Sequence, residues 1–190
     1  ALFAKAFPGD ADPIRMPNVQ TAIAAYEATL VTPNAPFDRF LRGDGTALNA
    51  AQRRGLRAFM DNGCAACHGG VNIGGSMYAK FGVAAPPPAD ILPPGDLGRF
   101  AITGDEADRY VYKVPTLRNI ALTAPYFHSG KVWSLDDAVT VMAGSQLGKA
   151  LSQQDVSDIA AFLQTLTGDQ PRTSVPPLPP VTGTSARPAD

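Results

Sequence analysis

The sequence predicts an all-α fold whose helices are joined by long irregular loops. Apolar residues recur at helical spacing in several segments, and the clearest of these segments begin with a residue that can cap a helix. No segment shows the convincing alternation of apolar and polar residues that is typical of a half-buried strand. Gly and Pro number 18 each, together about a fifth of the 190 residues, which predicts many turns outside the helices.

Length, composition and charge limit the number of domains and the partners. A chain of 190 residues has room for one domain of ordinary size with extensions, and 45% hydrophobic residues suffice for a real core. The net charge of −1 gives no strong field toward nucleic acid or an acidic membrane. No apolar run approaches the length of a membrane span. We therefore expect binding to neither nucleic acid nor membranes.

The first 45 residues predict three helical segments. "ALFAKAF" at the N-terminus resembles the end of an amphipathic helix. Residues 18–31 place apolar side chains on one helical face, with Asn18 as the expected N-cap. "FDRFLRGDG" follows two prolines and predicts one short helix that ends at a glycine.

Three later helices are each predicted from a capping box. The pairs of capping residues are Asn49 with Gln52, Ser134 with Asp137, and Ser152 with Asp155. The corresponding helices are expected over 50–62, over 135–143, and from 153 to the glycine at 168. We expect the last of them to bury Val156, Ile159, Ala160, Leu163 and Leu166, and the first to pack Met60 into the core.

Two stretches are too rich in glycine and proline to be regular. Residues 69–98 include "GGVNIGG" and "PPPADILPPGDLG", and so long a loop suggests a function or the wrapping of a cofactor. Residues 171–190 hold six prolines and predict an extended tail. We divide the chain into residues 1–45, a core domain over 46–170, and the tail over 171–190.

The chemistry concentrates in "DNGCAACHGG", residues 61–70, which holds both cysteines and one of the two histidines. A structural zinc site needs four ligands, and only one other histidine remains in the chain. A dithiol of the redox type is usual in a βαβ context, which is absent from this pattern. C-x-x-C-H is the attachment motif of a c-type haem. Cys64 and Cys67 would then bind haem c covalently, and His68 would be the proximal iron ligand.

The sixth ligand of such an iron is predicted less directly. Small c-type cytochromes usually supply a methionine from a segment just before the last helix, and Met142 fits that position. Met77 and His128 remain alternatives, whereas Met16 and Met60 lie in unsuitable places. Three arginines, Arg99, Arg109 and Arg118, could contact the haem propionates, and the sequence does not choose among them.

The fold class is thus an all-α c-type cytochrome. In bacteria this haem is attached outside the cytoplasm, which predicts a periplasmic protein.

Several stretches resemble the bacterial dihaem cytochrome c peroxidases. They are "AIAAYEATLVTPNAPFDRFLRGD", "GCAACHGGVNIGGSMY", "KVPTLRNIALTAPYFHSGKVWSLDDAV", "VMAGSQLGKAL" and "IAAFLQTLTGDQP". The related dihaem enzyme that matures methylamine dehydrogenase has a tyrosine at the position of Met142, so the methionine favours the peroxidase branch.

The resemblance implies an activity and a set of partners. A small c-type cytochrome or copper protein would donate electrons to the haem held by Cys64, Cys67, His68 and Met142. That haem would relay them to a peroxidatic haem that reduces hydrogen peroxide to water. The family also binds calcium, partly through backbone carbonyls that correspond to Thr123 and Pro125, and carbonyl oxygens suit this cation. A homodimer is a further expectation.

One departure from the family is large. The family has two C-x-x-C-H motifs and this chain has one, so residues 1–45 correspond to the end of the peroxidatic domain and the linker. No catalytic residue for peroxide cleavage can therefore be assigned, and we expect a fragment or one chain of a nicked enzyme. The alternative function is a free-standing monohaem electron carrier.

Overall fold

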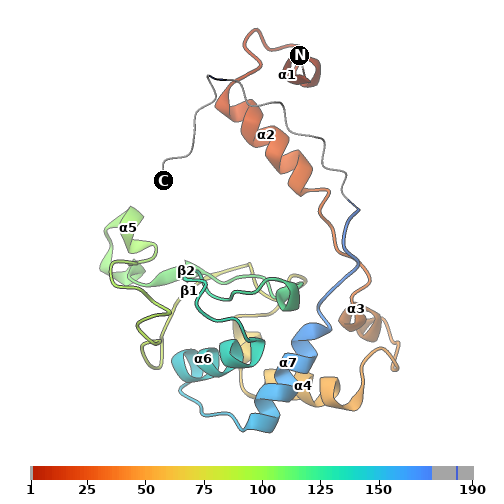
Figure 1. Cartoon of the computed structure of the whole chain (residues 1–190), viewed down its shortest axis with the longest axis vertical. Coiled ribbons are helices and arrows are strands. Elements are labelled where there is room, and N and C mark those ends of the chain that lie inside the picture. Colours follow the sequence, from red (N-terminus) through yellow and green to blue (C-terminus); the bar gives the residue numbers. More distant parts are fainter. Residues whose placement is uncertain (1, 173–182, 184–190) are drawn as a thin grey trace. The chain divides into compact units, whose positions relative to one another are not determined.

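The computed structural model describes residues 2–172 and residue 183. The described backbone divides into two compact units, one of residues 2–31 with residues 170–172, and one of residues 32–169 (Figure 1). The predicted all-α cytochrome-like architecture is confirmed, since helices and loops account for most of the described chain. The predicted extended tail lies almost wholly outside the described residues.

The first unit contains α1 (Leu2–Ala6) and α2 (Met16–Glu27). The prediction that Asn18 caps α2 is wrong, because the helix begins earlier and Arg15 is its N-cap residue. The amide of Asn18 instead donates hydrogen bonds to Asp10 Oδ2 and to the carbonyl of Pro13, both at 2.9 Å. Asn18 therefore fixes the turn before α2, and the helix ends at Glu27 instead of continuing to residue 31.

The second unit holds the longer helices that follow the linker. They are α3 (Pro36–Leu41), α4 (Ala50–Asp61), α6 (Leu135–Leu147) and α7 (Gln153–Gln164). The full capping box of α4 is present, with Asn49 and Gln52 bonding each other's backbone N–H. Ser134 and Ser152 accept N–H bonds from Asp137 and Asp155, which confirms the predicted starts of α6 and α7.

Helices α4 and α7 pack directly against each other, and Gly55 makes this possible. A Cβ atom added at Gly55 would lie 1.7 Å from the carbonyl oxygen of Asp158, so only glycine allows this approach. Arg54, the preceding residue, adds a forked ion pair to the Asp158 carboxylate at 2.8 and 2.9 Å. The expected burial of Met60 on α4 is wrong, since its side chain faces away from the packed side and is 57% exposed.

The main core lies where α3, α4 and α7 meet. Phe162 of α7 contacts Phe37 and Phe59, with ring centroids 5.3 Å apart in each pair. The buried set is Phe37, Leu48, Phe59, Ile159, Phe162, Leu163 and Leu166. All five residues expected to be buried on the last helical segment are buried, although α7 itself ends at Gln164, before Gly168.

Between α4 and α6 the chain is mostly loop, with one small sheet that the sequence did not indicate. Strand β1 (Tyr78–Lys80) pairs antiparallel with β2 (Val111–Lys113). Short helical turns lie along the same stretch: η1 (Cys64–Ala66), α5 (Phe100–Thr103), η2 (Glu106–Asp108) and η3 (Ile120–Leu122). A second apolar cluster packs here, formed by Phe81, Ile91, Tyr126, Val132 and Ala138. None of the described helices is long and apolar enough to cross a membrane.

Candidate functional site

A largely apolar cavity of about 530 Å³ lies in the second unit. Its walls come from α4, α6 and α7 on one side and from the loops and β-strands of residues 63–128 on the other. The aromatic and aliphatic lining includes Phe59, Phe81, Tyr112, Val114, Tyr126, Val139, Ile159 and Leu163. This size and this lining are typical of a site for a flat organic cofactor.

The attachment motif forms one tight turn at the edge of this cavity. Gly63 has φ +97° and ends α4, after which Cys64–Ala66 make a single helical turn. The N–H of His68 donates to the carbonyl of Cys64 at 3.0 Å, which folds the pentapeptide back on itself. Cys64, Cys67 and His68 all line the cavity, and both thiols are free. Burial raises the pKa of the Cys64 thiol.

His68 is partly buried, and its imidazole is neutral, which is the form that binds a metal. Burial lowers the pKa of His68, and backbone groups of Ile73 and Pro115 offset this only in part. The ring is therefore neutral near pH 7, as an iron ligand must be. Within the part of the chain that the structure describes, Nδ1 makes no hydrogen bond of good geometry. Since the backbone at Gly74 and Pro115 lies beside Nδ1, an iron in the cavity would bind the other ring nitrogen, Nε2.

The cavity separates the candidate sixth ligands into two groups. Met142, on α6, and His128 both line it. Met16, Met60 and Met77 do not, and their side chains are 67%, 57% and 40% exposed.

His128 is already engaged in polar and stacking contacts. Its Nε2 lies 2.9 Å from Asp96 Oδ2, and its ring stacks on Tyr112 at 4.6 Å. The hydroxyl of Tyr112 donates to Asp96 Oδ1 at 2.8 Å. Burial and this bond raise the pKa of Tyr112, which keeps the phenol protonated as a donor. No sequence motif indicated this cluster, because Tyr112 lies on β2 while Asp96 and His128 lie in two separate loops.

The predicted arginine contacts with haem propionates stay a prediction at this cavity. None of Arg99, Arg109 and Arg118 lines it. Each forms an ion pair elsewhere instead, with Asp108, Glu106 and Asp38 respectively. Asp108 and Glu106 lie in the same stretch between α4 and α6 as their arginines, whereas Asp38 lies on α3, 80 positions from Arg118.

The expected calcium residues also lie at the cavity. Thr123 and Pro125 line its wall, and the Thr123 hydroxyl donates to the carbonyl of Ile120 at 3.1 Å. Among the described residues no three His, Cys, Asp or Glu side chains gather as a metal cluster. A cation here would therefore depend mainly on backbone oxygens.

Two family models match the chain in sequence. A model of di-haem cytochrome c peroxidases matches residues 1–46, and the cytochrome c model matches residues 52–167. The chain is 55% identical over 188 residues to a cytochrome c551 peroxidase of Pseudomonas aeruginosa, covering 99% of this chain and 54% of that protein. It is 34% identical over 191 residues to the methylamine utilization protein MauG of Methylorubrum extorquens, covering 94% and 52%.

A solved structure supports the same relationship. A crystal structure of a MauG-like protein associated with microbial copper homeostasis superposes with a TM-score of 0.71 at 28% identity, covering 87% of this chain and 57% of that one. The chain thus spans about half the length of the curated relatives given above.

Proposed function

The chain belongs to the di-haem cytochrome c peroxidase family, and we propose that it is the electron-transferring half of such a peroxidase. The observation that carries the proposal is the convergence of Cys64, Cys67, His68 and Met142 on one apolar cavity. The cytochrome c domain and the peroxidase relatives imply haem c as the cofactor. When bound, haem c supplies a one-electron carrier.

The chain's own residues have three tasks in this proposal. The two thiols would hold the cofactor by thioether bonds, and His68 and Met142 would bind its iron. A thioether opposite an imidazole raises the reduction potential relative to two imidazoles. The apolar wall excludes water, which further favours the less charged, reduced iron. With both His68 and Met142 bound to the iron, the site would leave no position for peroxide and would serve electron transfer only.

The remaining parts of the proposal concern the whole protein. A small c-type cytochrome or copper protein donates electrons in the periplasm. A peroxidatic haem, held by protein that precedes the C-terminal half, reduces hydrogen peroxide to water. Calcium binds at the backbone carbonyls of Thr123 and Pro125, and the protein forms a homodimer.

The test uses the 190-residue chain expressed with haem attachment. We expect a covalent haem, a low-spin spectrum in the reduced state, and rapid electron uptake from a reduced small cytochrome in stopped-flow mixing. We also expect almost no peroxide turnover. Fast peroxide reduction by the isolated chain would contradict the proposal, and a colourless chain would contradict haem binding altogether.

A further inference from the structure

The loop that follows His68 has little stiffness of its own. Residues 69–75 contain four glycines and form no helix or strand. Gly70, Gly74 and Gly75 have φ of +74°, +121° and +81°, a region that glycine enters freely. The loop therefore keeps its shape through contacts with other segments.

Those contacts come from the segment 114–118. It bonds the loop backbone at three successive points: Gly75 N–H to Val114 O at 2.9 Å, Leu117 N–H to Ile73 O at 3.1 Å, and Thr116 Oγ1 to Asn72 O at 2.6 Å. Arg118 supplies a fourth point, because its Nε and Nη2 donate to the Val71 carbonyl at 3.0 and 2.8 Å.

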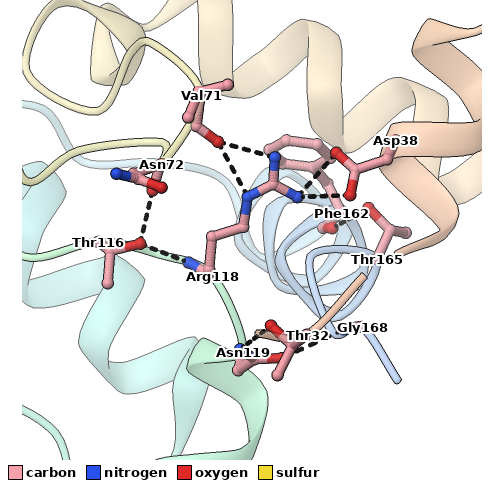
Figure 2. Close-up of polar contacts among 10 residues, drawn as sticks. All are labelled: Thr32, Asp38, Val71, Asn72, Thr116, Arg118, Asn119, Phe162, Thr165 and Gly168. Atoms are coloured by element: carbon pink, nitrogen blue, oxygen red, sulfur yellow. Dashed lines mark hydrogen bonds and ion pairs between the residues drawn. The ribbon is translucent and has the colours of Figure 1, made fainter. Parts of the chain in front are cut away.

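Arg118 also ties the loop to a helix (Figure 2). Its Nη1 lies 2.8 and 2.9 Å from the two carboxylate oxygens of Asp38, on α3. Both side chains are about four-fifths buried, with 20% and 22% exposed. The backbone N–H of Arg118 donates to the Thr116 hydroxyl, so the hydroxyl and the guanidinium act on the loop together. A planar guanidinium can bond a carbonyl and a carboxylate at once, and an ammonium group cannot reproduce this fork.

The loop that Arg118 holds forms the wall behind the imidazole of His68. A Cβ added at Gly74 would lie 2.1 Å from the Pro115 carbonyl and 3.2 Å from His68 Nδ1. The backbone at Gly74 therefore fills the space next to Nδ1 and keeps water from it.

From this geometry we propose that Arg118 is a positioning residue for His68: by fixing Val71 to Asp38 it holds the glycine loop against the imidazole and so sets the reduction potential of the iron. The proposal rests on ligation by His68, which belongs to the proposed function. Groups that surround a metal-binding histidine, and the degree to which they exclude solvent from it, are known to change the reduction potential of the metal.

The test is Arg118→Lys in the haem-loaded 190-residue chain. Because lysine keeps the positive charge, a change in potential reports the loop and not a lost charge. We expect amide exchange at residues 71–75 to accelerate at least about tenfold. We expect the ratio of reduced to oxidised haem, at a fixed solution potential, to fall about threefold or more as water reaches the imidazole and stabilises the ferric iron. The matched control is Arg54→Lys, which removes a similar fork that joins α4 to Asp158 on α7 and makes no bond to the loop backbone.

Two further measurements keep the outcome decisive. Thr116→Val removes the hydroxyl bond to Asn72 without changing charge, and we expect a smaller fall in the same ratio. It decides the matter if Arg118→Lys does not fold. A ratio unchanged in both variants, or changed no more than in Arg54→Lys, would overturn the proposal. The absorption spectrum of the unmodified chain is recorded before the variants are compared. If His68 did not bind the iron, that spectrum would not be the six-coordinate low-spin type.

Discussion

The two walls of the cavity keep their shapes by different means. The helical wall, formed by α4, α6 and α7, packs through buried apolar side chains such as Phe59 of α4 and Phe162 of α7. The loop wall, residues 69–128, has one three-residue strand pair and many glycines with positive φ. It depends on individual polar contacts such as the two hydrogen bonds from Arg118 to the Val71 carbonyl. The helical wall should therefore fold by itself, whereas the loop wall needs its polar contacts and a cofactor.

The largest expected effect tests the helical wall. Gly55→Ala places a Cβ 1.7 Å from the Asp158 carbonyl, so α4 and α7 must separate. Separation opens the core around Phe162, and we expect a loss of about 3 kcal/mol or more in the free energy of unfolding. Thermal or urea denaturation of the haem-loaded chain measures it.

Gly144→Ala is the matched control. Gly144 lies within α6, and a Cβ there meets no atom within 4 Å. Alanine in a helix interior is favoured over glycine, so this variant should gain about 0.5–1 kcal/mol. Equal losses of stability in the two variants would show that the α4–α7 contact at Gly55 is no tighter than the surroundings of Gly144.

Removing the cofactor tests directly whether the two walls differ in their dependence on it. In the double variant Cys64→Ser, Cys67→Ser the haem cannot be attached, and the apolar cavity remains without its filling. We expect amide exchange across residues 69–128 to accelerate by at least about tenfold, while the amides of α4 and α7 remain protected. Hydrogen exchange followed by mass spectrometry measures both in one experiment. Uniform loss of protection would contradict the independence of the helical wall.

Sequence reasoning succeeded where structure is decided locally. The capping pairs at Asn49 and Ser152 specified the starts of α4 and α7, because each bond joins residues three apart. The C-x-x-C-H spacing placed Cys64, Cys67 and His68 in one turn for the same reason. The helical wall and one edge of the candidate site were thus accessible from the sequence.

Prediction from the sequence failed where interacting residues are distant from each other in the chain. Strands β1 and β2 are too short to show alternation, and their pairing joins Tyr78 to Lys113. The ion pair between Asp38 and Arg118 spans 80 positions. The prediction at Asn18 failed although the partner is near in sequence, because the Asn18 side chain donates to Asp10 instead of capping α2. Most of the loop wall consists of such contacts, so sequence patterns indicated only that it would be irregular.

A change at the cavity itself should have an intermediate effect. Met142→Ala removes the proposed thioether ligand, and loss of that ligand disfavours the reduced iron. We expect the ratio of reduced to oxidised haem at a fixed potential to fall at least tenfold, which is about 59 mV for one electron. Spectroelectrochemical titration measures it. Met77→Ala, at a 40% exposed methionine outside the cavity, should leave the potential unchanged. An equal change in both variants would remove Met142 from the ligand role.

The smallest expected effect is a pH dependence on the helical wall. The hydrogen bond from Arg54 lowers the pKa of Asp158 below its ordinary value of 3.8, against the opposing effect of burial. A carboxyl with a lowered pKa stabilises the fold above its ordinary value and loses this effect as the pH falls through its folded value. Asp158→Asn should therefore lower the melting temperature at pH 7, and its difference from the unmodified chain should shrink as the pH drops below 3.8. Asp90→Asn, in an exposed loop, controls for the change in net charge. A difference that persists or grows in acid would mean that Asp158 stabilises α4 and α7 by packing alone, and the forked ion pair would then contribute nothing to the helical wall.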